Sequence, residues 1–211
     1  MEVLLDFNDL LIKGASQLGV ALTGVQVDAF AVYLAELLKW NAKTNLTAID
    51  EPGEVLVKHF LDSLTLVRML PKGRFRAADI GSGAGFPGLA LKVVLPEMEL
   101  VSVEPARRKA AFQRQAARLM GLKSVTVLER RLEDVLPEEA MFDVVLSRAF
   151  KEPGLLLPGL SGLLAQGGRV VLSVGPEQTL QPPEGWTILA SEKIILPFSE
   201  YSRTVATYIP A

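Results

Sequence analysis

The sequence predicts a doubly wound α/β fold with a mostly parallel sheet, and three observations support this prediction. A glycine-rich run over residues 78–88 follows a short apolar segment and precedes a helix-like one. From residue 75 onward, apolar segments typical of buried strands alternate with segments of helical periodicity, an order that builds parallel sheets with right-handed crossovers. At 211 residues and 49% hydrophobic side chains, the chain is long enough for one such domain with a sizeable core.

The first 70 residues predict a helical N-terminal cap. Apolar residues at spacings of three and four indicate helices near residues 4–18, over 25–41 with Thr23 as its N-cap, and over 54–70, where Pro71 ends the last helix. We therefore expect two units: a helical cap over about residues 1–70 and a cofactor-binding domain over about residues 71–211.

The rest of the chain predicts the elements of the sheet. Strands are expected at residues 77–80, 100–103, 125–128, 142–146 and 169–174, with helices at 89–95, 107–120 and 154–164 between them. Two further strands, at 186–196 and 202–209, follow one another without an intervening helix. They are expected to form an antiparallel pair at the edge of the sheet.

The glycine-rich run is where a cofactor is expected. Residues 83–88 match G-x-G-x-x-G, and Glu104 follows about 20 residues later, which is the pattern for a dinucleotide such as NAD. Two residues favour S-adenosylmethionine (SAM) instead. Pro87 has no N–H to offer a pyrophosphate, and the carboxylate of Asp79 repels phosphate but can anchor an ammonium group, directly or through water. SAM is the favoured cofactor, and NAD remains the alternative.

Ligands of open parallel sheets bind beyond the carboxyl ends of the strands. The first strand ends there at Asp79 and the loop glycines Gly81, Gly83 and Gly85, and the second ends at Glu104. Glu104 is expected to accept hydrogen bonds from both ribose hydroxyls, because a carboxylate offers two acceptor oxygens.

The third and fourth strands add three more candidates at the same edge. Leu132 and Glu133 follow the third strand and are expected beside the adenine. Arg148 stands alone at the end of the fourth strand, as a contact to RNA or cofactor or as the partner of a nearby carboxylate. We expect Arg148 beside the reacting atoms.

Charge is unevenly distributed along the chain. The net charge is −2, yet residues 58–131 hold 14 Lys/Arg against 6 Asp/Glu. Because this segment also contains the glycine loop, a basic surface around the site would attract a polyanion such as RNA. The candidate phosphate contacts are Arg107, Arg108, Arg114 and Arg118, whose alternative role is the solvated face of one helix.

The composition excludes several classes of chemistry. The chain has no cysteine and one histidine, His59, so disulfides, a cysteine nucleophile and a thiolate metal site are excluded, and no metal is expected. The first residues lack the features of a signal peptide, and no apolar stretch is long enough to span a membrane. We expect a cytoplasmic protein without a membrane partner.

Four stretches, in the same order along the chain, resemble the RsmG family, also called glucose-inhibited division protein B. They are residues 40–49 (WNAKTNLTAI), 59–64 (HFLDSL), 79–88 (DIGSGAGFPG) and 147–150 (SRAF). The resemblance implies a class I, Rossmann-like SAM-dependent methyltransferase that makes 7-methylguanosine in small-subunit (16S) ribosomal RNA, acting on that RNA or on the small ribosomal subunit. The cofactor contacts that it implies fall at Gly81, Phe86, Leu132, Glu133 and Arg148.

The chemistry of the implied reaction agrees with the absence of an obvious general base. N7 of guanine carries an in-plane lone pair and needs no deprotonation, so correct placement of the two reactants supplies the rate. The product base is cationic, and Asp62 and Asp79 are both conceivable stabilising groups. A SAM enzyme acting on a protein or small molecule and a non-catalytic RNA-binding protein are the remaining alternatives.

Overall fold

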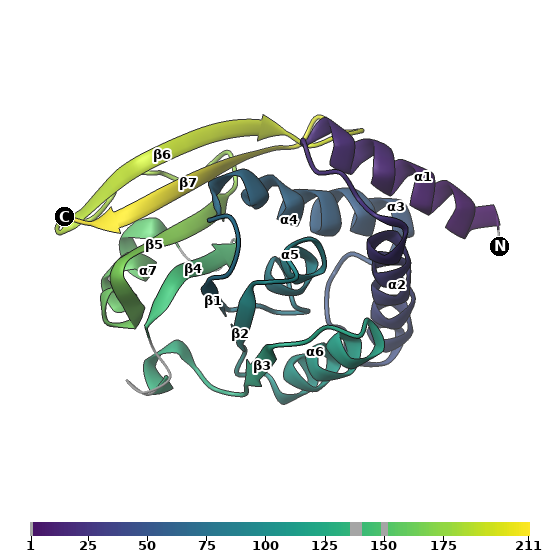
Figure 1. Cartoon of the computed structure of the whole chain (residues 1–211), viewed down its shortest axis with the longest axis horizontal. Helices are drawn as coiled ribbons and strands as arrows, with labels where there is room; N and C mark the ends of the chain where they lie inside the picture. The colour runs from purple at the N-terminus through teal and green to yellow at the C-terminus, as the bar shows by residue number, and fades with distance from the viewer. Residues whose placement is uncertain (1, 136–140, 149–151) are drawn as a thin grey trace.

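A seven-stranded mixed sheet forms the centre of the computed structural model, which describes residues 2–135, 141–148 and 152–211 (Figure 1). The strand order is β3-β2-β1-β4-β5-β7-β6. Strands β1 to β5 are parallel, and β7 runs antiparallel to both of its neighbours. The strands are β1 (Arg76–Ile80), β2 (Glu99–Val103), β3 (Val125–Leu128), β4 (Phe142–Arg148), β5 (Leu164–Val174), β6 (Trp186–Ile195) and β7 (Ser202–Pro210).

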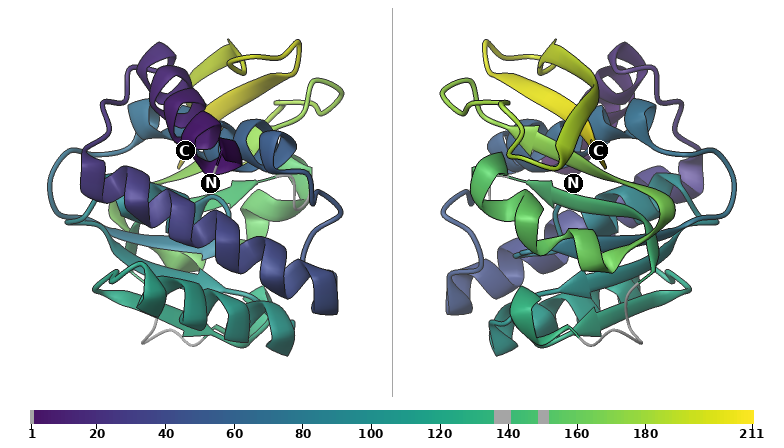
Figure 2. Two further views of the ribbon diagram at one scale, coloured as in Figure 1. Left: turned by 90° about the vertical axis from the view of Figure 1, so that its right-hand side faces the viewer. Right: turned by 90° about the vertical axis from the view of Figure 1, so that its left-hand side faces the viewer.

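Helices cover both faces of this sheet. In Figures 1 and 2, α2, α5 and α6 lie on one side and α7 on the other. The α-helices are α1 (Glu2–Gln17), α2 (Gly24–Thr44), α3 (Pro52–Val55), α4 (Asp62–Leu64), α5 (Gly88–Val94), α6 (Arg107–Leu119) and α7 (Pro153–Leu156). The doubly wound fold, its antiparallel edge pair and the helical character of the first 70 residues are confirmed. Among the described residues, no helix is long and apolar enough to cross a membrane.

Two of the expected helices are less regular than their periodicity suggests. Residues 154–164 form only α7 and two 3-10 turns, and β5 begins at Leu164, where it already pairs with Phe142 of β4. Three glycines and Pro158 explain the interruption, since glycine and proline disfavour a continuous helix. Residues 52–69 are helical throughout but include a π-helical segment, Leu56–Leu61, before α4 and a final 3-10 turn.

The N-terminal helices and the sheet share one hydrophobic core. Phe30 of α2 and Phe60 of the π-helical segment belong to the same buried cluster as Leu100 of β2 and Val144 of β4. A second cluster, around Tyr208 of β7, lies under α7 on the other face. The boundary near residue 70 stays a prediction, because the buried side chains on its two sides pack against each other.

Helix α2 runs antiparallel to α6. Its first turn is fixed by a capping box between Thr23 and Gln26, whose side chain also donates to the carbonyl of Val93. Further along, the ring of Trp40 lies edge-on against Phe112, with centroids 5.8 Å apart. The C-terminal end of α2 therefore lies beside the start of α6, at the edge of the sheet where the parallel strands end.

Candidate functional site

The glycine loop after β1 needs its glycines for different reasons. Gly81, Gly83 and Gly85 all have positive φ, which costs little without a Cβ. A Cβ on Gly85 would lie 2.5 Å from Leu89 Cδ1 and 2.7 Å from Tyr33 Oη, so packing requires glycine there. A Cβ on Gly83 would meet nothing closer than the Gly81 carbonyl at 4.0 Å. Gly83 thus leaves its outer side open to a ligand.

Most main-chain amides of this loop are bonded within the protein. Gly83 N donates to Glu104 Oε2 (2.8 Å), Gly85 N and Phe86 N to the Ser82 carbonyl (2.8 and 2.9 Å), and Gly88 N to Asp79 Oδ2 (2.7 Å). A dinucleotide-binding loop offers such amides to the pyrophosphate. The loop is therefore poorly suited to NAD, in agreement with the expectation from Pro87.

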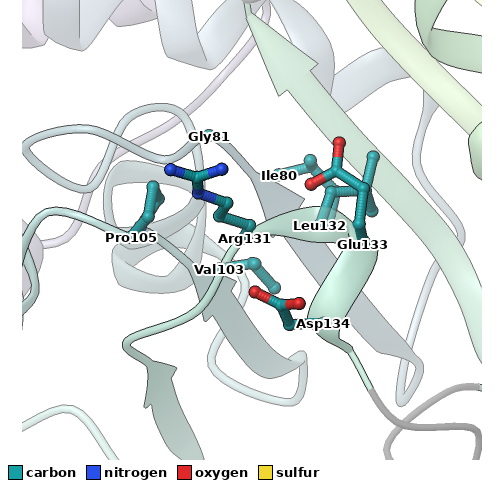
Figure 3. A pocket seen from close by; sticks show the side chains of 8 residues that line it. All are labelled: Ile80, Gly81, Val103, Pro105, Arg131, Leu132, Glu133 and Asp134. Carbon is teal, nitrogen blue, oxygen red and sulfur yellow. The ribbon is translucent and has the colours of Figure 1, made fainter.

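The larger hollow of the site, about 510 Å³, lies between this loop and the residues after β3 (Figure 3). Its walls are Ile80, Gly81, Val103, Pro105 and residues 131–134. In Figure 3 the guanidinium of Arg131 lies between Pro105 and Gly81, while Leu132 and Glu133 stand on the opposite side. The structure thus brings together three of the predicted cofactor residues: Gly81, Leu132 and Glu133.

Asp79 and Glu104 are both buried, and both hold the loop. Burial raises the pKa of Asp79 to about 7, against the lowering effect of the Gly88 hydrogen bond and of Arg148. Its Oδ1 has no hydrogen-bond partner among the described residues. Glu104 accepts from Gly83 N through one oxygen and from Ala106 N (2.9 Å) through the other. Each oxygen retains a further lone pair, so the ribose contact of Glu104 stays a prediction.

A smaller hollow of about 150 Å³ adjoins the other side of the loop. It is lined by Gly81–Ala84 and Phe86 of the loop, by Leu46 and Thr47 after α2, and by His59 and Arg148. Because Gly81 lines both hollows, they meet at the end of β1. This is the place where a cofactor on one side would face an acceptor on the other.

Arg148 lies in the wall of the smaller hollow, held by three partners. Its Nη1 donates to the Lys58 carbonyl (2.7 Å) and to Asp62 Oδ2 (3.1 Å), and its Nη2 donates to His59 Nδ1 (3.0 Å). Asp62 is fully buried and also accepts from Arg203 Nε (3.1 Å). Of the roles expected for Arg148, the structure shows the partner of a carboxylate, and its contact to a cofactor or RNA stays a prediction.

His59 is held in one neutral form. An arginine can only donate, so Nδ1 must be an acceptor, and Nε2–H donates to Thr47 Oγ1 at 3.0 Å. Burial, followed by the charge of Arg148, lowers the pKa of His59 to about 3. Its ring stacks on Phe86, with centroids 4.6 Å apart, and Tyr33 stacks on Phe86 at 5.0 Å. Phe86 is thus enclosed between two rings, which leaves little of it to contact a ligand.

The predicted RNA contacts on α6 are exposed but spread out. Arg107, Arg108, Arg114 and Arg118 are all exposed. Arg114 is paired with Glu129 (3.5 Å) and donates to the Val127 carbonyl. Arg118 lies eleven positions after Arg107 along the helix, about 16 Å away. Only the first turn of α6 lies at the strand ends, so the four arginines do not form one cluster around the site.

Sequence reasoning gave no role to Tyr33, Arg203 or the pairing of His59 with Arg148. These contacts join residues 51 to 141 positions apart, and no local pattern marks them. The last two residues of the 147–150 stretch, Ala149 and Phe150, lie outside the described residues.

Comparison with known proteins gives close relatives over most of the chain. The family model described as "GidB: rRNA small subunit methyltransferase G" matches residues 26–187. The protein named ribosomal RNA small subunit methyltransferase G from Geobacter metallireducens is 43% identical over 79% of this chain and 76% of its own length. The protein of the same name from Myxococcus xanthus is 37% identical over 96% of both chains.

Solved structures share the fold at low sequence identity. A SAM-dependent methyltransferase from Aquifex aeolicus superposes with a TM-score of 0.58 at 16% identity, over 79% of this chain and 97% of that one. TrmN from Thermus thermophilus gives 0.56 at 20% identity, over 74% of this chain and 53% of that one. The family match and the identity of the relatives show that this chain belongs to the rRNA small subunit methyltransferase G (GidB) family.

Proposed function

We propose that this protein transfers a methyl group from SAM to N7 of a guanine in the RNA of the small ribosomal subunit. The observation that carries the proposal is the family membership, which covers the glycine loop and both hollows that meet at it. A ribosomal substrate also places the activity in the cytoplasm. The RNA itself and the assembled small subunit are both compatible with the site.

The residues of the larger hollow, with two acids beside it, fit SAM. Leu132 and Glu133, in the wall of the hollow, would hold the adenine, one by apolar contact and one near its amino group. Glu104, which directly precedes Pro105 of the wall, would accept from the ribose. Asp79 is buried and lines neither hollow, but its Oδ1, which has no hydrogen-bond partner among the described residues, would receive the ammonium of the methionine part, directly or through a water molecule. The open side of Gly83, in the smaller hollow next to where the two hollows meet, lets the ligand lie against the main chain. When bound, SAM supplies an electrophilic methyl group on a sulfonium centre.

The smaller hollow fits an acceptor that needs no general base. The lone pair of His59 Nδ1 is engaged by Arg148, and Nε2 carries the proton, so this histidine has no free basic nitrogen. A guanine N7 reacts through an existing lone pair, and the site contributes by fixing its position relative to the methyl group. Arg148, fixed by Asp62 and His59, would be the side chain that sets this position.

Mapping of 7-methylguanosine on small-subunit RNA from cells that lack the protein tests the proposal. One site should be unmethylated there and regain its methyl group when the purified protein and SAM are added. Calorimetry with S-adenosylhomocysteine (SAH) and with NADH tests the cofactor separately, and binding of NADH alone would refute it. Binding of SAH without methyl transfer to any RNA would favour a non-catalytic RNA-binding protein.

A further inference from the structure

A third hollow, of about 230 Å³, lies at the C-terminal end of α2. Lys39, Trp40, Lys43 and Thr44 line it, and we call it the Trp40 groove. The indole is fixed in place, because its Nε1 donates to the buried Glu36 at 2.8 Å and its ring packs edge-on against Phe112. A rigid aromatic ring at the wall of a surface groove is the kind of platform on which an unpaired base stacks.

The groove lies next to the smaller hollow of the site. Thr44 lines the groove, and Leu46, only two residues later, lines the smaller hollow. Two residues span at most about 7 Å of extended chain. The segment after α2 thus separates the Trp40 groove from the place assigned to the reacting guanine.

The charge of the groove suits a phosphate backbone. Lys39 and Lys43 are both exposed, and the acid that contacts the groove, Glu36, is buried and shared between Lys39 Nζ (3.3 Å) and Trp40 Nε1 (2.8 Å). Because α2 and α6 are antiparallel, the first turn of α6, with Arg107, Arg108 and Lys109, lies at the same end. The end of α2 therefore carries an excess of positive charge around a fixed ring.

We propose that the Trp40 groove binds a nucleotide of the RNA strand next to the target guanine, with the base on the Trp40 ring and the adjoining phosphates at Lys39 and Lys43. This inference rests on the proposed function, because it concerns the RNA nucleotide next to the guanine that the proposed function places in the smaller hollow. It places the main RNA contact at the end of α2 and the first turn of α6, and not along the whole arginine-bearing length of α6.

The fluorescence of Trp40 tests the stacking directly. The chain has two tryptophans, and the other, Trp186, is buried at the start of β6. In a Trp186→Phe variant, saturation with naked small-subunit ribosomal RNA should quench the remaining indole and shield it from acrylamide. In the matched Trp40→Phe variant, the emission of Trp186 should not change. Equal quenching in both variants, or none in the first, would overturn the stacking.

The lysines give a second test that does not disturb the core. Binding of a Lys39→Gln, Lys43→Gln double variant to small ribosomal subunits that lack the methyl group is measured at several salt concentrations, with SAH present. Each lost phosphate contact should lower the slope of log Kd against log salt by about 0.7 in a single strand. The control is Lys123→Gln. Lys123 is an exposed lysine just before β3, at the amino ends of the parallel strands and so away from the site, and the slope of this variant should equal that of the unaltered protein.

The outcomes separate this inference from the proposed function. A double variant with the same slope as Lys123→Gln would overturn the assignment of the groove, whatever the methyl-transfer activity. Both tests measure binding, so an unaltered protein that binds RNA but transfers no methyl group would refute the proposed function alone. The affinity of each variant for SAH should be unchanged, because neither lysine lines the hollows assigned to the cofactor and the guanine.

Discussion

Asp62 joins three distant parts of the chain through one buried carboxylate. Its Oδ2 accepts from Arg148 of β4 and Arg203 of β7, each at 3.1 Å, and its Oδ1 accepts from Ser173 of β5 at 3.4 Å. Asp62→Asn keeps the shape of the side chain but removes its charge. The guanidinium groups of Arg148 and Arg203 then lose the carboxylate that neutralises them, in a region with little water.

The size of the effect follows from this burial. Breaking a buried ion pair by removing one partner costs about 3–5 kcal/mol. The side chains of Arg148 and Arg203 are 13% and 25% exposed, so water compensates part of the loss, and we expect the low end of that range. In a chain of this size each kcal/mol shifts Tm by about 2–4 °C. The melting temperature should therefore fall by roughly 6–12 °C.

Thermal unfolding, with SAH binding as a check on the folded state, measures this loss. The control is Glu54→Gln, which breaks the surface pair with Lys58 and should cost far less, because water and salt screen such a pair. Methyl transfer at saturating RNA should also be slower in Asp62→Asn, because Arg148 loses its alignment. A melting temperature no lower than that of Glu54→Gln would refute the reasoning.

Three further predictions concern the site. Gly83→Val should abolish SAH binding in calorimetry while costing only about 1–2 kcal/mol of stability, since the position is left-handed but open; tight binding would show that the ligand does not approach there. Between about pH 4 and pH 6.5, unfolding takes up a proton at His59 and releases one at Asp79, so the two groups have opposite effects on the pH dependence of stability. In Asp79→Asn only the His59 effect remains, and the free energy of unfolding should rise with pH by up to about 1.4 kcal/mol per pH unit more than in the unaltered protein. Equal slopes for the two proteins in denaturant titrations at several pH values would contradict the raised pKa of Asp79. Arg148→Ala should lower turnover at saturating RNA, whereas a loss confined to RNA affinity would make it one more phosphate contact.

The fold could be predicted because its signals are local. Alternating apolar strands, helical spacing and the glycine run each lie within a few residues of one another, and the observed strands begin and end within two residues of expectation except at β5. There Leu164 already pairs with Phe142 of β4, but residues 165–168 bulge out of the ladder, and pairing resumes only at Arg169 opposite Val144. Gly167, with φ of 75°, lies in this bulge, so the two glycines mark a real break in the pairing, and only the early pairing of Leu164 depends on the tertiary fold.

The site could be predicted only where it follows from the strand ends. Gly81, Leu132 and Glu133 meet at one hollow because parallel strands end at one edge. The partners of Arg148 come from a helical segment almost 90 residues earlier, and Glu104 uses its oxygens to hold the loop. The first depends on how the N-terminal helices pack on the sheet, and the second on how the loop after β1 folds against the end of β2; periodicity specifies neither.

The position of β7 between β5 and β6 has a consequence for synthesis on the ribosome. The N-terminal helices emerge from the ribosome first, but the hydrogen bond between Asp62 and Arg203 can form only after Arg203 is translated, 141 residues later. Among the described strands, β6 pairs with β7 alone, so it remains unpaired until β7 has left the exit tunnel. Contacts of such long sequence separation slow folding and leave intermediates exposed. The sheet of the nascent chain is therefore incomplete until β7 is inserted between β5 and β6.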